Sequence, residues 1–97
     1  MPLVPQITFH HLDPSPAVED AIREHAGRLE RFHDRITSCR VVVETSHRHQ
    51  RKGRIFHVGI ALVLPGTEIV VKRDRERDHA HEDVYVAIRD AFDAARR

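Results

Sequence analysis

The spacing of apolar residues changes three times along this chain, and this limits the folds that it can adopt. Residues 3–10, 37–46 and 54–64 alternate apolar and other side chains with the period of a β-strand. Residues 68–73 are rich in β-branched side chains, which strands favour. Two other segments repeat their apolar residues at steps of three and four, as amphipathic helices do. The predicted order of elements is therefore β-α-β-β-β-α.

The first helical segment begins at Pro16 and is expected to run to about residue 32 or 33. Ser15 accepts a hydrogen bond from a free N–H of the first turn, and Pro16 needs no hydrogen-bond acceptor there. Gly27, in mid-helix, costs about 1 kcal/mol relative to alanine, and we expect that it permits close packing. The predicted apolar stripe consists of Val18, Ile22, Ala26 and Leu29, continued by Phe32 or His33.

The second helical segment opens with Glu82 and Asp83. Negative charge is favoured there by the unpaired N–H groups and by the positive end of the helix dipole. The predicted buried face consists of Val84, Ile88, Ala91, Phe92 and Ala95.

The connections between these elements indicate the topology. A link as long as the first helix favours a right-handed crossover between two parallel strands, and the last three strands can form an antiparallel meander. We therefore predict an α+β fold, a four-stranded mixed sheet with both helices on one face, and treat residues 1–97 as one domain. The last helix shows no stop signal at residues 93–97, so the chain is either a short form or the N-terminal part of a longer protein.

Positive charge is concentrated in the middle of the chain. The net charge is −2 over residues 1–46, +5 over residues 47–77 and −2 over residues 78–97. A cluster of this kind is typical of proteins that bind a phosphate backbone, although a solvated arginine-rich surface would have the same composition.

Several function classes find no support. No run of about 18 apolar residues is present to span a membrane, and the N-terminus lacks the pattern of a secretory signal. A lone Cys39 within a strand fits a reducing compartment, so we expect a cytoplasmic protein. There is no glycine-rich phosphate loop, nucleophile elbow or evident carboxylate pair, so we expect no enzyme, no cofactor and no small-molecule substrate. The pairs His47/His49 and His79/His81 lack convergent partners, and we expect no metal site.

The aromatic residues favour recognition of RNA by its backbone and shape. The phenylalanines fall mostly on core positions, and Tyr85 is expected at the edge of the core. No exposed aromatic platform for single strands is therefore expected.

Two motif blocks resemble one known family. Arg28-Leu29-Glu30-Arg31-Phe32 closes the first helix, and His81-Glu82-Asp83-Val84-Tyr85-Val86-Ala87-Ile88 opens the second. Both resemble the ribosome hibernation promoting factors, also called ribosome-associated inhibitors, protein Y or sigma-54 modulation proteins, which have the same order of elements. The resemblance implies binding to rRNA of the small ribosomal subunit, in the channel for mRNA and tRNA, and steric inhibition of initiation.

The resemblance places Arg28 and Arg31 against small-subunit RNA, although either could instead pair with Glu24 or Glu30. The basic loop at residues 47–54 is often shorter in the family, and relatives usually carry lysine where Ala94 stands. The predicted RNA-binding residues are Arg23, Arg28, Arg31, Arg48, Arg51, Lys52, Arg54, Lys72, Arg73, Arg75, Arg89, Arg96 and Arg97. The alternative is a general structured-RNA-binding or protein-interaction module of the same fold, and the oligomeric state stays open.

Overall fold

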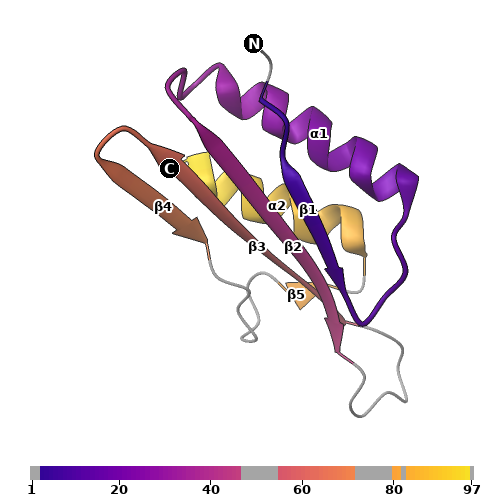
Figure 1. Cartoon of the computed structure of the whole chain (residues 1–97). Coiled ribbons are helices and arrows are strands. Elements are labelled where there is room, and N and C mark those ends of the chain that lie inside the picture. The colour runs from indigo at the N-terminus through magenta and orange to yellow at the C-terminus, as the bar shows by residue number, and fades with distance from the viewer. Residues whose placement is uncertain (1–2, 47–54, 72–79, 82, 97) are drawn as a thin grey trace.

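The computed structural model describes residues 3–46, 55–71, 80–81 and 83–96. It confirms the predicted order of elements and adds one short strand (Figure 1). The elements are β1 (Gln6–His10), α1 (Pro16–Glu30), β2 (Ser38–Ser46), β3 (Ile55–Leu64), β4 (Thr67–Val71), β5 (Ala80–His81) and α2 (Val84–Arg96).

The four main strands lie in the order β1-β2-β3-β4. β1 pairs parallel to β2, with Gln6 opposite Arg40, so α1 is the predicted crossover. β2, β3 and β4 form the predicted antiparallel meander. β5 pairs with β3 beside Phe56 and His57, and it was not predicted because two residues are too short to show a periodicity.

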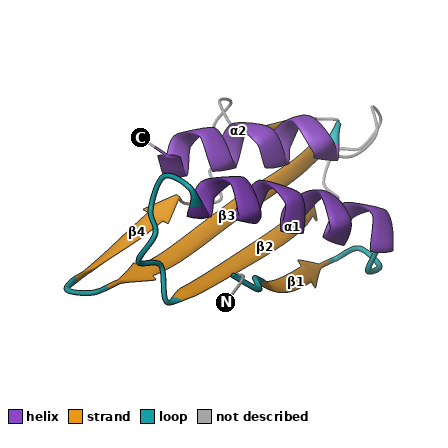
Figure 2. Ribbon diagram, turned by 90° about the horizontal axis from the view of Figure 1, so that it is seen from above, coloured by secondary structure: helices purple, strands orange, loops and turns teal. Residues whose placement is uncertain are grey.

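Both helices lie on one face of the sheet, as predicted, and run side by side in the same direction (Figure 2). The core lies between this helical layer and the sheet, and the predicted stripes of both helices pack into it, Val84 being only half-buried. The buried apolar side chains of the core are Val18, Ile22, Ala26, Leu29, Cys39, Val41, Val43, Val58, Ile60, Leu62, Ala87, Ile88, Ala91, Phe92 and Ala95.

The end of α1 differs from the prediction. The helix stops at Glu30, and the N–H groups of Arg31 and Phe32 donate to carbonyls three residues back, at 3.1 and 2.9 Å. This tighter turn breaks the α-helical spacing, because three-residue bonds wind the chain more closely. His33 continues the stripe as a half-buried side chain, whereas Phe32 turns outward and is 57% exposed.

The expectation that Gly27 permits close packing is wrong. A Cβ built at this position meets no atom within 4 Å in the described part of the chain, apart from its own helix backbone and chain neighbours. Gly27 lies on the exposed side of α1, so no neighbour requires the missing side chain.

The sheet face opposite the helices is partly exposed. Arg40 and Val70 are exposed there, on β2 and β4, and Ala61 lies between them in the register. Within the described residues, neither helix combines the length and the apolar character needed to cross a membrane.

Candidate nucleic-acid interface

The orientation of α1 on the sheet determines which of its side chains face solvent. Ser15 caps the helix, since its Oγ accepts a hydrogen bond from the N–H of Val18 at 3.3 Å. With the apolar stripe turned to the sheet, Arg28 lies exposed in the last turn, and Arg31 lies exposed at the C-cap. Two guanidinium groups therefore stand at the C-terminal end of this helix.

The orientation of α2 likewise determines which of its side chains face solvent. Asp83 is the predicted acidic start, and its Oδ1 accepts a hydrogen bond from the N–H of Tyr85 at 2.9 Å. Phe92 is buried, while Arg89 and Arg96 are exposed. Because the helices are adjacent and run in the same direction (Figures 1 and 2), their arginine-bearing ends adjoin.

A groove of about 460 Å³ lies between these two ends. Four of the predicted RNA-binding residues line it, Arg28 and Arg31 on one side and Arg89 and Arg96 on the other, with one acid, Asp93. The remaining lining residues are His25, Leu29, Phe32 and Phe92. The fold thus brings together basic residues from two helices that are far apart in the sequence.

Aromatic side chains form part of the groove. The ring of His25 stacks on that of Phe92, with centroids 5.3 Å apart and planes at 14°. The guanidinium carbon of Arg96 lies 4.3 Å from the ring centroid of Phe32, a cation–π distance. Burial, and next the positive charge of Arg28, lower the pKa of His25 below 6.5, so its imidazole is mostly neutral at pH 7.

The two arginines of α1 differ in their ion pairs. Arg28 pairs with Glu24 at 3.2 Å, as the alternative interpretation expected. Glu30 instead accepts a hydrogen bond from the backbone N–H of Leu3 at 3.3 Å. Among the described residues, Arg31 has no ion-pair partner, so its charge is available to a ligand.

The ion pairs within the groove are weak obstacles to binding. Arg89 lies 3.4 Å from Asp90, and its side chain is 60% exposed. That of Arg28 is 59% exposed. Exposed pairs of this kind are typically worth about 0–1 kcal/mol, so a phosphate can replace the carboxylate at little cost.

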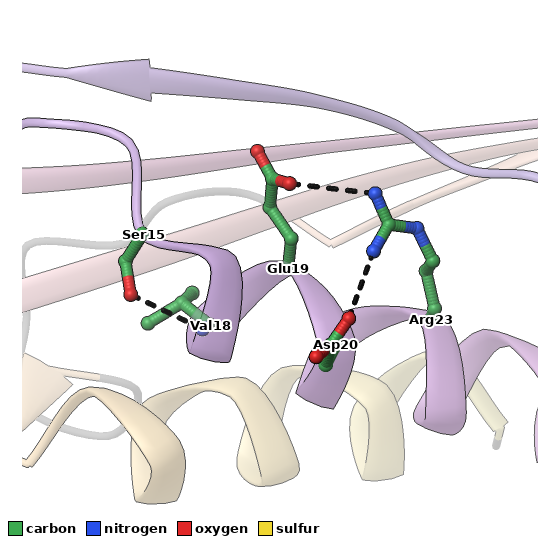
Figure 3. Close-up of polar contacts among 5 residues, drawn as sticks. All are labelled: Ser15, Val18, Glu19, Asp20 and Arg23. Carbon is green, nitrogen blue, oxygen red and sulfur yellow. Dashed lines mark hydrogen bonds and ion pairs between the residues drawn. The ribbon is translucent and has the colours of Figure 1, made fainter.

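Arg23 is placed differently from the other helix arginines. Its guanidinium donates to Asp20 at 3.0 Å and to Glu19 at 3.4 Å (Figure 3). Two carboxylates thus neutralise its charge locally, and it does not line the groove.

The other predicted RNA-binding residues lie outside the described residues. They are Arg48, Arg51, Lys52, Arg54, Lys72, Arg73, Arg75 and Arg97. In the described part of the chain, no three His, Cys, Asp or Glu side chains are grouped so that they could hold a metal ion.

Phe9, Phe56 and Phe92 lie in or against the core, as expected, but two aromatic side chains are more exposed than expected. Phe32 is 57% exposed and Tyr85 is 47% exposed, and the former lies in the groove. Helical periodicity could not predict the exposure of Phe32, because steps of three and four residues from Leu29 lead equally to Phe32 and to His33. Arg40 is exposed on the open sheet face, and it was not among the predicted contacts.

Comparison with known proteins identifies the family. A family model described as Sigma 54 modulation protein / S30EA ribosomal protein matches residues 6–97. The ribosome hibernation promoting factor of Azotobacter vinelandii is 35% identical over 82 residues, covering 84% of this chain and 65% of that protein. The chain therefore spans less than two thirds of the length of this relative. The factor of the same name from Acinetobacter guillouiae is 31% identical over 98 residues, covering 95% and 81%.

A solved structure agrees at the level of the fold. The N-terminal domain of Thermus thermophilus Protein Y superposes with a TM-score of 0.74 at 22% identity, over 99% of this chain and 92% of that one. The resemblance predicted from the two motif blocks is thus confirmed. This chain belongs to the Sigma 54 modulation protein / S30EA ribosomal protein family.

Proposed function

We propose that this protein is a hibernation factor that binds rRNA of the small ribosomal subunit and inhibits initiation. It occupies the channel in which mRNA and the anticodon ends of tRNA lie, and it acts in the cytoplasm by steric exclusion. No chemical step, cofactor or small-molecule substrate is involved, and residues 1–97 act as one domain. The family and the names of its relatives support this proposal.

The observation that carries the proposal is the groove with four arginines. A guanidinium donates hydrogen bonds in a planar fork that matches a phosphate, and it stays charged at any physiological pH. Arg31 binds first in this scheme, because no ion pair within the described residues has to be broken. Arg28, Arg89 and Arg96 then take further phosphates around the groove.

The predicted residues outside the described part of the chain remain secondary contacts in the proposal. They are Arg48, Arg51, Lys52, Arg54, Lys72, Arg73, Arg75 and Arg97. Arg23 becomes a control position, since it lies outside the groove and pairs with Glu19 and Asp20.

Co-sedimentation with purified small ribosomal subunits tests the proposal. We expect binding that decreases steeply between about 50 and 200 mM salt, because phosphate contacts release counterions. Addition of mRNA together with tRNA should displace the protein.

Two charge-matched variants separate the groove from general electrostatics. Arg28→Gln/Arg31→Gln and Arg23→Gln/Arg40→Gln each remove two positive charges, but only the first pair lies in the groove. We expect the first to lose binding and the second to keep most of it. Equal losses would refute the groove as the binding site. Binding that survives mRNA and tRNA, and that extends to unrelated structured RNA, would instead identify a general RNA-binding module.

A further inference from the structure

We propose that the groove between α1 and α2 holds one unstacked nucleobase against the ring of Phe32, so that its RNA ligand carries a bulged or single-stranded nucleotide. This inference rests on the proposed function and specifies the kind of RNA that the same site takes. It concerns the aromatic part of the groove, whereas the arginines alone would serve any phosphate backbone.

The position of Phe32 is the first reason. The N–H of Phe32 donates to the carbonyl of Leu29 at 2.9 Å, and this turn directs the ring away from the core. Phe32 is 57% exposed, while Leu29 and Phe92 beside it are buried. A large apolar ring at the mouth of a groove is a surface on which another flat group can stack.

The second reason is that a flat cationic group already lies over this ring. The guanidinium carbon of Arg96 is 4.3 Å from the ring centroid of Phe32. A nucleobase offers the same flat shape, and stacking of a base on an aromatic ring exceeds an exposed cation–π contact in strength. When the base takes this place, the released guanidinium of Arg96 is free to bind the phosphate next to it.

The dimensions and walls of the groove fit one nucleotide. Its volume of about 460 Å³ lies within the range of small-ligand sites, and it is far too small for a double helix. The stacked aromatic rings of His25 and Phe92 line part of it. Arg28, Arg31 and Arg89 surround it, where the phosphates on either side of an extruded base would lie.

A pair of matched RNAs tests the inference with the full chain. One is a fully paired hairpin, and the other is the same hairpin with a single unpaired nucleotide in its stem. Fluorescence anisotropy gives the ratio of the two dissociation constants, in which the general phosphate contribution cancels. We expect the wild-type protein to prefer the bulged hairpin by about ten-fold, the scale of one base–aromatic stack.

Three variants identify the responsible side chain. Phe32→Leu keeps an apolar side chain but removes the aromatic ring, and it should reduce the preference to about one-fold. Phe32→Tyr keeps the ring and should retain the preference. Tyr85→Leu removes the other exposed aromatic side chain, which lies outside the groove, and should change nothing. Since Phe32 is exposed, its replacement does not empty a core position.

The outcomes distinguish this inference from the proposed function. A preference that Phe32→Leu leaves intact would overturn the inference, and so would a wild-type protein that binds both hairpins equally. In either case, loss of small-subunit binding by Arg28→Gln/Arg31→Gln would still support the proposed function. If the wild-type protein binds neither the hairpins nor the small subunit, both proposals fail.

Discussion

Two glycines of this protein allow a test of how backbone conformation affects stability, because packing does not change when either is replaced by alanine. Gly27 lies within α1 with an ordinary helical conformation, whereas Gly66 lies in the turn between β3 and β4 with φ +80°. A Cβ at either position meets nothing within 4 Å in the described part of the chain, beyond the chain neighbours and the local helix backbone. Replacement by alanine therefore neither creates a clash nor fills a cavity.

The expected effects have opposite signs. Gly27→Ala should increase the free energy of unfolding by about 0.5–1 kcal/mol, because alanine has less backbone entropy to lose on entering a helix. For a domain of this size, that corresponds to an increase in Tm of roughly 2–8 °C. Gly66→Ala should decrease stability by about 1–2 kcal/mol, because a Cβ disfavours the left-handed region. Pro65 precedes Gly66, and a turn with proline at its second position and positive φ at its third suits glycine there.

Urea and thermal denaturation followed by circular dichroism measure both variants under identical conditions. The reasoning is refuted if Gly27→Ala lowers Tm, or if Gly66→Ala is neutral. The first result would mean that Gly27 contacts something which the described structure does not contain. The second would mean that the turn can relax to a conformation with negative φ.

Three further predictions concern single side chains. Arg31→Gln should reduce the salt dependence of RNA binding, measured as the slope of log K against log salt concentration, by about 0.7–0.9. Arg23→Gln should leave this slope unchanged, and equal changes in both variants would contradict the groove as the binding site. Cys39 is 1% exposed and burial raises the pKa of its thiol to about 11, so we expect a maleimide to label it only as fast as the protein opens; rapid labelling of the native protein would argue against this burial. Burial and the charge of Arg28 lower the pKa of His25 in the folded protein. At pH values between this lowered pKa and the ordinary value of about 6.5, the unfolded chain therefore binds more protons than the folded chain. Stability should therefore decrease as the pH falls through this window, and His25→Gln should remove that part of the decrease in urea titrations at pH 7.5 and 5.5; an identical pH dependence in the variant would show that other groups cause it.

The order and the faces of the elements could be predicted from the sequence because they depend on local chemistry. Ser15 and Asp83 cap the helices through bonds to N–H groups only two or three residues away. The alternation in 37–46 and 54–64 assigned each residue to a sheet face, and the buried side chains Val41 and Val58 agree with it. Periodicity of this kind survives folding because the core needs one continuous apolar face on each element.

The ends of the elements were less predictable. At the end of α1, hydrogen bonds to carbonyls three residues back replace those of one further α-helical turn, and the two arrangements are similar in energy. No residue in 31–33 is a strong helix breaker that would decide between them. The outward position of Phe32 follows from that choice. β5 likewise exists only because β3 offers an open edge beside Phe56 and His57.

The sequence alone therefore determined that this chain forms an α+β fold, where its two helices begin, and that Arg28 and Arg89 lie on exposed helix faces. Only the tertiary structure decided that these arginines share one groove, that Arg23 is neutralised outside it, and that Phe32 is exposed within it. The physical reason is the range of the interactions. Hydrogen bonds and periodicity act within a few residues, whereas the groove exists because two helices, far apart in the sequence, bury their apolar stripes side by side on the same sheet.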